Sequence, residues 1–306
     1  MNWNPTYSIT NHLLTLIREI GEALGEIKAL PVSKRDLAEL EFQARELSTY
    51  ASTSIEGNPL PLTDVKRVLK SHKKTIRDTE REVLNYNKAL QAIYDAVSQG
   101  MFKLSLREIE IIQGRVVKGL MDNPAHIGAI RNDGVIIRDP RQRDDIVFLP
   151  PDAKDVPALM AELVRFINAH MGDIEPVILA GLFHRQCVII HPFMDGNGRT
   201  TRLVTSAILG LGGLDLFRIF SFENYYNQNV TRYFKAVGLE GDYYDLRDDI
   251  DHSRWLEYFA EGILDELTRV RKAMISLKPP VRLEPHHKDI LTYIDAHGSI
   301  TQREYA

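Results

Sequence analysis

The sequence predicts a mainly α-helical protein with one small β-hairpin. Three observations lead to this class. Apolar residues recur mainly at spacings of three and four, which is the pattern of amphipathic helices. Only one stretch, GAIRNDGVIIRDPRQRDDIVFLPP, carries short β-branched runs around a polar turn, as expected for a hairpin. Two segments on either side of a glycine-rich loop, VILAGLFHRQCVII and RTTRLVTSAILGLGGL, are apolar nearly all round, which indicates a buried pair of helices.

Residues 1–100 are expected to form a helical N-terminal region. HLLTLIREIGEALGEIKAL has helical periodicity and stops before Pro31. SKRDLAELEFQARELSTYASTSIEG follows, giving a second helix at about 35–57 with Ser33 as its N-cap. TDVKRVLKS and TEREVLNYNKALQAIYDAVSQ come next, with Thr63 and Thr79 in capping positions.

Residues 101–275 are expected to form the core of the protein. LSLREIEIIQGRVVKGL reads as a helix, and the hairpin follows at about 134–149. Helices resume at DVPALMAELVRFINAH and continue to about Ser276. Three prolines in LKPPVRLEP indicate a linker at 276–285. Residues 286–306 then read as one helix, a glycine turn and the start of another helix.

Composition limits the class of protein. The chain has 306 residues, 44% apolar and 26% charged, with a net charge of −4, which gives no general sign of nucleic-acid or membrane binding. Its N-terminus lacks a signal-peptide pattern, and no apolar run reaches the roughly 18 residues of a membrane span. Its one cysteine, Cys187, lies in the apolar run CVII and is expected to be buried and inert. We therefore expect a cytoplasmic protein without disulfides.

The loop between the two apolar helices is HPFMDGNGRTTR, residues 191–202. Pro192 ends the first helix, because the residue before proline avoids the α region. Gly196 and Gly198 allow a tight turn and a close approach of the backbone to a ligand. The second helix should begin near Gly198. Its first N–H groups have no partner within the helix, and its dipole is positive there, so its start is an anion site.

The other polar residues of this loop predict a reaction. Arg199 and Arg202 share one face of the first helical turn, and guanidinium groups pair well with phosphate oxygens. Asp195 supplies the single carboxylate with which Mg²⁺ is usually held beside phosphates. His191 can accept a proton at neutral pH. Together they predict attack by a hydroxyl on a metal-bound nucleotide phosphate. The alternative is a glycine turn whose charged residues face solvent.

HPFMDGNGRTTR resembles the HPFxDGNGRxxR signature of the Fic family at every fixed position, and the resemblance extends more loosely over residues 101–275. It implies a mainly α, Fic-type helical core with a small β-hairpin flap. Most family members transfer AMP from ATP to a hydroxyl of a target protein, with Mg²⁺ and release of pyrophosphate. The resemblance implies that His191 is the catalytic base and that Asp195 binds Mg²⁺. It also implies that the phosphates of ATP are bound by Gly196, Asn197, Gly198, Arg199 and Arg202.

The hairpin at about 134–149 corresponds to the flap on which family members dock a segment of their target protein by strand pairing. PPDAKDVPALM, which follows the hairpin, resembles the run that commonly follows such flaps. An exposed strand edge accepts an extended chain through its unpaired backbone groups. Arg138, Arg141 and Arg143 are expected to be solvated loop charges. The alternative is a simple surface hairpin.

The stretch STSIEG, residues 52–57, has two interpretations. Locally it is a helix end, with Gly57 at the C′ position and Glu56 as a carboxylate that the helix dipole disfavours. It also resembles the [S/T]xxxE[G/N] motif of the inhibitory helix in self-inhibited Fic proteins. That resemblance, which includes Ser52, implies that Glu56 pairs with Arg202 and removes a phosphate clamp, so that ATP binds unproductively.

Two further features lie downstream. FENYYNQNVTRYFKAV is similar to a segment that lines the adenine pocket in relatives, which makes Asn229, Tyr233 and Phe234 candidates for nucleotide binding. Aromatic residues at helical spacing more often belong to the core, and Trp255 is expected to pack there. Residues 286–306 resemble the opening of a winged helix–turn–helix, and DNA binding would need a complete one.

The first hypothesis is therefore an autoinhibited protein adenylyltransferase with ATP as substrate and Mg²⁺ as cofactor, acting on a protein target that can include itself. One alternative is a regulatory module that binds nucleotide or DNA without turnover. Another is a Fic enzyme that removes AMP from a modified target. The signature also leaves open a UMP or phosphocholine donor, because it contacts phosphates and not the base. The oligomeric state stays open, with a homodimer among the options.

Overall fold

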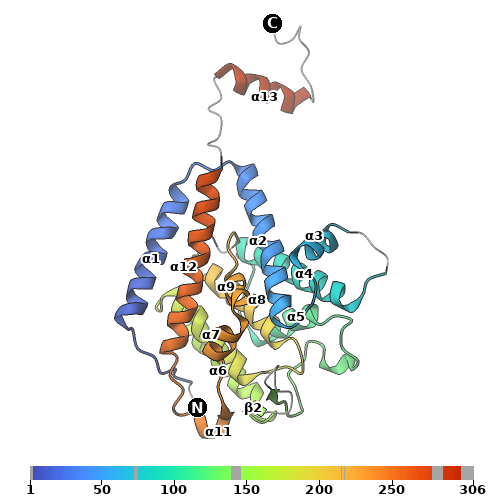
Figure 1. Ribbon diagram of the computed structural model, residues 1–306, viewed down its shortest axis with the longest axis vertical. Coiled ribbons are helices and arrows are strands. Elements are labelled where there is room, and N and C mark those ends of the chain that lie inside the picture. Colours follow the sequence, from blue (N-terminus) through green and yellow to red (C-terminus); the bar gives the residue numbers. More distant parts are fainter. Residues whose placement is uncertain are drawn as a thin grey trace.

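The computed structural model describes residues 3–71, 75–138, 146–214, 216, 218–277 and 285–297. Within them the chain is mainly helical, with a small sheet at one end (Figure 1). The helices of the N-terminal part are α1 (Asn11–Ala29), α2 (Lys34–Ile55), α3 (Leu62–Lys70) and α4 (Asp78–Ser98). The remaining helices are α5 (Leu106–Val116), η1 (Pro124–His126), α6 (Val156–Ala169), α7 (Pro176–Ile190), α8 (Asn197–Leu211), α9 (Phe222–Gln228), α10 (Val230–Val237), α11 (Tyr243–Leu246), α12 (Ser253–Ser276) and α13 (Pro285–His297).

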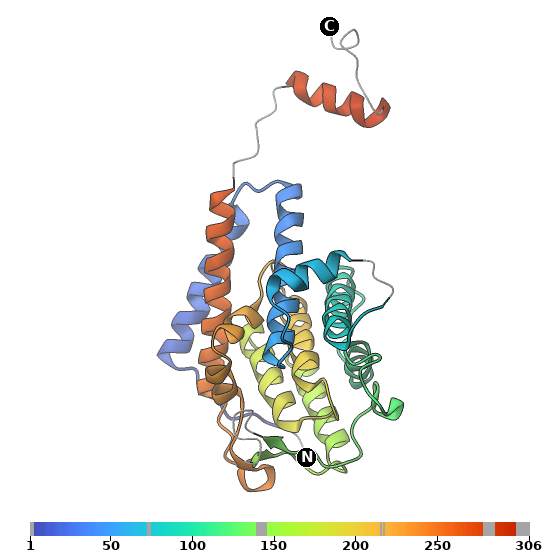
Figure 2. The same cartoon turned by 45° about the vertical axis from the view of Figure 1, so that its right-hand side comes forward.

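The first two helices form where the sequence predicts them. The Thr10 side chain caps α1 by accepting a hydrogen bond from the Leu13 amide at 3.0 Å. Ser33 caps α2 in the same way, accepting from the Asp36 amide at 3.1 Å, which confirms the predicted N-cap. In both views α1 runs alongside α12, so the first helix of the chain packs against the long helix that closes the core (Figures 1 and 2).

The caps predicted for the next two helices are wrong. α3 begins at Leu62, because the carbonyl of Pro61 already accepts a hydrogen bond from the Asp64 amide at 2.9 Å. Thr63 therefore lies inside the first turn. α4 begins at Asp78, one residue before Thr79. The Glu80 carboxylate there accepts from the backbone N–H of Arg77 at 3.0 Å, so the N3 side chain stabilises the helix start.

The hairpin prediction is confirmed for the described residues. Strands β1 (Ile137–Arg138) and β2 (Ile146–Leu149) pair antiparallel, while the turn with Arg141 and Arg143 lies outside the described residues. A third strand, β3 (Gly241–Asp242), was not predicted. It pairs parallel with β2, so the strand order is β1-β2-β3. Among the described residues, β2 is thus enclosed on both sides, and the outer edge of β1 carries no strand.

The core surrounds α7 and α8, the central helices in both views (Figures 1 and 2). Nearly every residue of α7 is buried, as its all-apolar sequence predicts. Cys187 is 1% exposed, and burial raises its pKa to about 12, so the prediction of an inert, buried thiol is confirmed. Trp255 is fully buried and donates its indole N–H to the Gly181 carbonyl at 2.7 Å, as expected for a packing residue.

The ends of α5 and α12 can be compared with the predicted helix and domain boundaries. α5 ends at Val116, about one turn before the predicted end, and the chain then turns through Gly119 in the left-handed region at φ 70°. α12 ends at Ser276, where the sequence places the end of the core. Within the predicted linker at 276–285, residues 278–284 lie outside the described residues, as do 298–306. α13 forms the helix predicted at the start of the winged-helix-like segment, whose identity stays a prediction.

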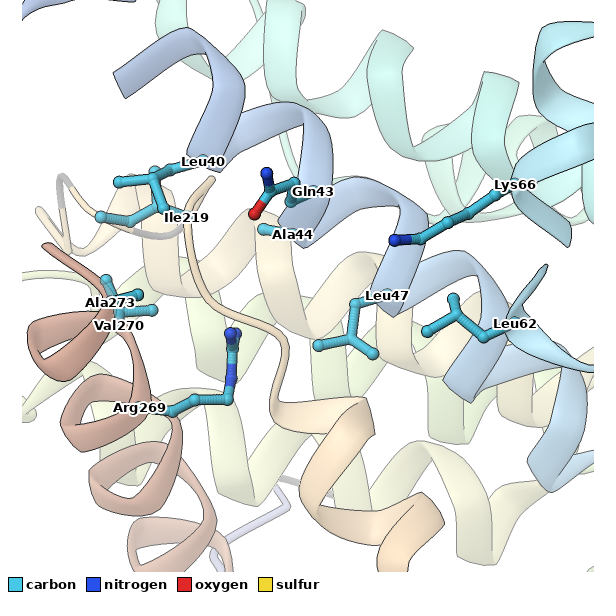
Figure 3. Close-up of a pocket in the computed structure, with 10 residues that line it drawn as sticks. All are labelled: Leu40, Gln43, Ala44, Leu47, Leu62, Lys66, Ile219, Arg269, Val270 and Ala273. Carbon is cyan, nitrogen blue, oxygen red and sulfur yellow. The ribbon is translucent and has the colours of Figure 1, made fainter. Parts of the chain in front are cut away.

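One pocket of about 180 Å³ lies beside the middle of α2 (Figure 3). α2, α3 and α12 supply most of its lining, and no residue of the 191–202 loop contributes. Its walls are mostly apolar, with Lys66 and Arg269 as the cationic members. The chemistry predicted for the loop must therefore be sought elsewhere in the molecule. No helix of the described residues is both long and apolar enough to span a bilayer.

Candidate active site

The 191–202 loop turns sharply between α7 and α8. α7 ends at Ile190, and His191 adopts the left-handed region at φ 51°, the one non-glycine residue with positive φ among the described residues. Gly196 is also left-handed, at φ 80°, and a Cβ there would lie 2.8 Å from a methyl group of Val117. α8 starts at Asn197, one residue before the predicted start. Two residues of the loop therefore adopt the left-handed region. Gly196 does so readily, whereas His191 does so against its preference.

Asn197 holds this turn closed. Its side-chain oxygen accepts from the Phe193 amide at 2.8 Å, and its side-chain nitrogen donates to the Phe193 carbonyl at 2.7 Å. The Phe193 ring is fully buried, so the loop is anchored in the core. The resemblance implied that Asn197 binds phosphate oxygens. In the structure its side chain is held by the backbone of Phe193 and so shapes the turn, and its binding of phosphate oxygens stays a prediction.

His191 has the properties of a neutral base. Its Nδ1 lies 3.3 Å from the Val188 carbonyl, which can only accept, so the ring proton belongs on Nδ1 and Nε2 keeps its lone pair. Burial lowers the pKa of His191 to about 4, and the positive charge of Arg131 acts in the same direction. The imidazole is thus uncharged at neutral pH, with Nε2 able to accept a proton.

Arg131 fixes the backbone beside that base, and sequence reasoning missed it. Its Nε donates to the His191 carbonyl at 2.8 Å, and its amide donates to the Pro192 carbonyl at 3.0 Å. The guanidinium also donates to the carbonyls of Asp133 at 3.0 Å and Pro151 at 2.5 Å, on the two flanks of the hairpin. The residue is only 2% exposed, and burial lowers its pKa. Arg131 therefore joins the hairpin to the His191 turn.

Arg202 is held by the end of α2. Its Nη2 donates to Glu56 Oε1 at 2.7 Å, its Nε donates to Ser52 Oγ at 2.8 Å, and its Nη2 also reaches the Ser52 carbonyl at 2.9 Å. The Arg202 side chain is 1% exposed and that of Glu56 is 29% exposed. Burial would raise the pKa of Glu56, but the charges of Arg202 and Arg199 outweigh it and hold that pKa below its usual value.

Glu56 lies directly on the predicted anion site. A Cβ added at Gly198 would lie 2.2 Å from Glu56 Oε1 and 2.9 Å from Arg202 Nη1. The carboxylate therefore sits over the first turn of α8, where helix N–H groups and the positive dipole end attract an anion. Glycine at position 198 leaves the room for it. Arg202 Nη1 is buried and has no hydrogen-bond partner among the described residues.

Arg199 is held by a carboxylate that sequence reasoning also missed. Its Nη1 donates to Glu82 Oε1 at 2.7 Å, and its Nη2 donates to Asp195 Oδ1 at 2.9 Å. Asn58 donates to Glu82 Oε2 at 2.7 Å. Burial raises the pKa of Glu82, the charge of Arg199 opposes this, and the neighbouring Glu56 adds to it. One signal was available, because Glu82 is in register with the buried stripe of Tyr86, Ala89, Leu90 and Ile93 on α4.

Asp195 fits the role of a single metal-bound carboxylate. Its side chain is 50% exposed, while its Oδ1 accepts from the Gly196 amide at 2.5 Å and from Arg199. No group of three His, Cys, Asp or Glu side chains among the described residues could hold a metal by itself. A Mg²⁺ ion at Asp195 would therefore take its other ligands from phosphates and water, as this ion commonly does.

The structure places the three downstream candidates in different environments. Tyr233 is buried, stacks on Tyr226 with ring centroids 4.4 Å apart, and places its hydroxyl 3.1 Å from His184 Nε2. Asn229 caps α10 by accepting from the Arg232 amide at 3.0 Å. Phe234 keeps 42% of its surface exposed. The structure gives Tyr233 and Asn229 structural tasks, and the binding of adenine by this segment stays a prediction.

With this geometry in place, the comparisons with known proteins identify the region. The Fic/DOC family model matches residues 103–209, which include α5 to α7, most of α8, the hairpin and the whole 191–202 loop. Residues 103–209 belong to the Fic/DOC family. The resemblance drawn from the signature is thereby confirmed for this region, whereas Glu56 and Glu82 lie outside the matched segment.

The relatives of the Fic region agree. Protein adenylyltransferase Fic of Drosophila erecta is 30% identical over 192 residues, which cover 61% of this chain and 36% of that protein. Its counterpart in Drosophila virilis is 32% identical over 199 residues, covering 63% of this chain and 39% of that protein. This chain thus spans less than two fifths of the length of these curated relatives.

Solved structures show the same fold. A Fic family protein from Desulfovibrio desulfuricans superposes with a TM-score of 0.76 at 22% identity, covering 99% of this chain and 89% of that one. Fic-1 of C. elegans superposes with a TM-score of 0.65 at 20% identity, covering 86% of this chain and 73% of that one. The predicted mainly helical Fic-type fold with a small hairpin is confirmed.

Proposed function

We propose that this Fic protein is a protein adenylyltransferase that transfers AMP from ATP to a hydroxyl group of a target protein. The observation that best supports this proposal is the loop itself, which joins a neutral His191 to the anion site at the start of α8. The low pKa of His191 and its free Nε2 suit a base, and Arg199 and Arg202 flank the anion site. The curated relatives are named protein adenylyltransferases, which supports the same reaction class.

The transfer proceeds as a substitution at the α-phosphorus of ATP. The hydroxyl oxygen of the target attacks that phosphorus, and the bond to the bridging oxygen of the β-phosphate breaks. Pyrophosphate leaves with the electron pair of that bond. His191 Nε2 accepts the hydroxyl proton, which raises the nucleophilicity of the oxygen. Asp195 is the residue that would hold Mg²⁺, and the ion would neutralise phosphate charge.

Glu56 keeps the enzyme inactive in the conformation described here. Its carboxylate lies over the first turn of α8 and occupies Arg202, the cation that would bind the terminal phosphate. A phosphate oxygen and the Glu56 carboxylate would compete for the same donors, and two anions so close repel one another. Displacement of Glu56 is therefore the activating step, and Arg202 Nη1, which has no hydrogen-bond partner within the described part of the chain, is a ready donor for phosphate.

The hairpin provides the docking surface for the target. β3 already pairs with β2, so an extended target segment would add to the outer edge of β1. Arg131 ties both flanks of the hairpin to His191, which places a docked segment and the base in one frame.

The single, buried thiol of Cys187 is compatible with activity in a reducing cytoplasm.

Intact-protein mass spectrometry after incubation with ATP and Mg²⁺ tests the proposal. We expect Glu56→Gly to gain about 329 Da per modified hydroxyl, the mass added by adenylyl transfer, and wild type to gain little. Glu56→Gly/His191→Ala should gain nothing. Equal gains in wild type and Glu56→Gly would retain the transferase and reject the inhibition. Absence of any gain, with or without an added lysate as a source of targets, would reject the transferase.

The position of Glu56 favours a second candidate reaction, removal of AMP from a modified protein. A carboxylate over the cradle could position a water for attack on the phosphodiester. Self-modified Glu56→Gly/His191→Ala cannot be made, so purified self-modified Glu56→Gly serves as substrate after removal of ATP. Release of AMP by added wild type, but not by added Glu56→Gly, would support this reaction. Equal, slow release in both cases would argue against it.

A further inference from the structure

We propose that Glu82 is a second internal carboxylate that competes with nucleotide phosphates for Arg199, so that two carboxylates from the N-terminal helices, and not Glu56 alone, set the affinity for ATP. The inference rests on the proposed function, in which Arg199 and Arg202 are the phosphate ligands. Its basis is geometric. Each of these two arginines is paired with one carboxylate that belongs to a helix outside the matched Fic region, Glu56 on α2 and Glu82 on α4.

The contact to Glu82 is close and enclosed. Arg199 Nη1 and Glu82 Oε1 are 2.7 Å apart, and the two side chains are 6% and 16% exposed. Asp195 takes Nη2 of the same guanidinium, and Nε is buried without a hydrogen-bond partner among the described residues. Both terminal nitrogens of Arg199 are therefore occupied. A phosphate oxygen that approaches the end of this guanidinium therefore has to share its terminal nitrogens with these two carboxylates or displace one of them.

The charges of the site lead to the same conclusion. Three carboxylates, those of Glu56, Glu82 and Asp195, face two guanidinium groups, those of Arg199 and Arg202. With His191 neutral, this set sums to a net charge of −1, which does not attract a polyphosphate. Loss of Glu56 brings the sum only to zero. Replacing the second carboxylate by a neutral group is needed to make the protein side of the site positive.

Asn58 connects the two carboxylates mechanically. It follows Glu56 by two residues, just after the left-handed Gly57 that ends α2. Its side-chain nitrogen donates to Glu82 Oε2 at 2.7 Å and to the Thr79 carbonyl at 2.9 Å, both on α4. A movement of the α2 end that withdraws Glu56 from Arg202 would pull on this contact. Release of one carboxylate therefore weakens the support of the other.

Isothermal titration calorimetry with Mg²⁺–ATP tests this inference, with His191→Ala in every protein so that no transfer occurs. The proteins are the background itself, Glu56→Gly, Glu82→Gln and Glu56→Gly/Glu82→Gln. Glu22→Gln serves as the control, because this exposed α1 residue loses the same charge far from the loop. We expect Glu82→Gln to tighten binding roughly five- to tenfold in the Glu56→Gly protein, and Glu22→Gln to change nothing.

An unchanged or weaker affinity in Glu56→Gly/Glu82→Gln than in Glu56→Gly would overturn the inference, since Glu82 would then orient Arg199 for the phosphate. Failure of Glu56→Gly to bind more tightly than its background would instead reject the inhibition by Glu56. In that case Glu82→Gln against the background still tests Glu82 by itself. If Glu82→Gln does not fold, Glu82→Asp, which keeps the charge but shortens the reach to Arg199, should tighten binding by a smaller factor, and no tightening would count against the inference.

Discussion

The two sides of the 191–202 loop are held by different kinds of partner. On the His191 side, Arg131 is surrounded by carbonyl oxygens, neutral acceptors that belong to the loop and to the hairpin flanks. On the other side, Arg199 and Arg202 pair with the carboxylates of Glu82 and Glu56, with Ser52 as an additional acceptor for Arg202. Backbone carbonyls cannot leave without unfolding the segment, whereas a carboxylate can be exchanged for a phosphate of like charge. The proposed base is thus fixed, and the partners of the proposed phosphate ligands are exchangeable.

The largest effect should come from disturbing the fixed side. In a Glu56→Gly protein, Arg131→Lys keeps the charge but cannot reach carbonyls on both the loop and the hairpin. We expect kcat for self-modification to fall about 100-fold, because a small displacement of a base costs this much. The Kd for Mg²⁺–ATP should stay unchanged. Arg199→Ala, the matched change on the exchangeable side, should instead raise that Kd. A rise in Kd for Arg131→Lys with kcat unaltered would erase the distinction.

The next effect concerns stability on the exchangeable side. Glu56→Gln keeps the size of the side chain but leaves the buried Arg202 charge without its anion. We expect the free energy of unfolding to fall by about 1–3 kcal/mol, more than for an exposed pair, because Arg202 is enclosed while Glu56 is partly exposed. Urea denaturation measures it, with the exposed Glu22→Gln as the reference variant. A loss as small as that of the reference would show that Ser52 alone suffices for Arg202.

Ser52→Ala should have a smaller effect of the same kind. It removes the hydroxyl that accepts from Arg202 Nε at 2.8 Å but leaves the Ser52 carbonyl and Glu56 in place. One hydrogen bond to a charged group contributes about 1.5 kcal/mol or more, equivalent to roughly tenfold in an equilibrium constant. The rate of self-modification should then lie between wild type and Glu56→Gly. A rate equal to wild type would limit the restraint to the Glu56 carboxylate.

The smallest expected effect is that of pH, because lowering the pH over most of the accessible range should leave the rate unaltered. His191 must be neutral to act as a base, and its pKa is lowered to about 4. Protonation therefore abolishes activity only as the pH falls through about 4, whereas an unperturbed histidine would lose it near pH 6.5. The kcat/KM of Glu56→Gly/Glu82→Gln, which lacks the two carboxylates supplied by the N-terminal helices, should be flat between pH 8 and about pH 5. A midpoint near 6.5 would show that the ring is not desolvated.

The same contrast explains what could be read from the sequence. The loop, its glycine turns and the start of α8 are local features, so spacing and residue type predicted them to within one residue. The pairing of Glu56 with Arg202 spans 146 positions, and only the resemblance to a known motif suggested it. Arg131 and Glu82 meet their partners 60 and 117 positions away and carry no local motif. Single charges on helices or in loops usually face solvent, which hides such partners from sequence reasoning.

The capping errors have a related cause. Thr63 and Thr79 are good N-cap residues by type, but the chain had other means of starting each helix, Pro61 before α3 and the Glu80 carboxylate in α4. Capping propensity ranks the candidate N-cap residues within a short window, and the other groups that can start the helix decide which candidate is used. The outcome shifted each boundary by one or two residues without altering which helices form, because the buried stripes of α3 and α4 determine that.

Glu56 and Arg202 belong to one chain, and this has a consequence for how the protein responds to its surroundings. Because the fold holds the Glu56 carboxylate beside Arg202, it acts as a ligand at a fixed effective concentration. It cannot be diluted away, so the balance between the two anions is the same in a sparse and in a crowded cell. Only the level of the free nucleotide, or a force that shifts the end of α2, can tip it. Under the proposed function, the strength of the Glu56–Arg202 contact thus sets the ATP concentration that is needed to displace the carboxylate.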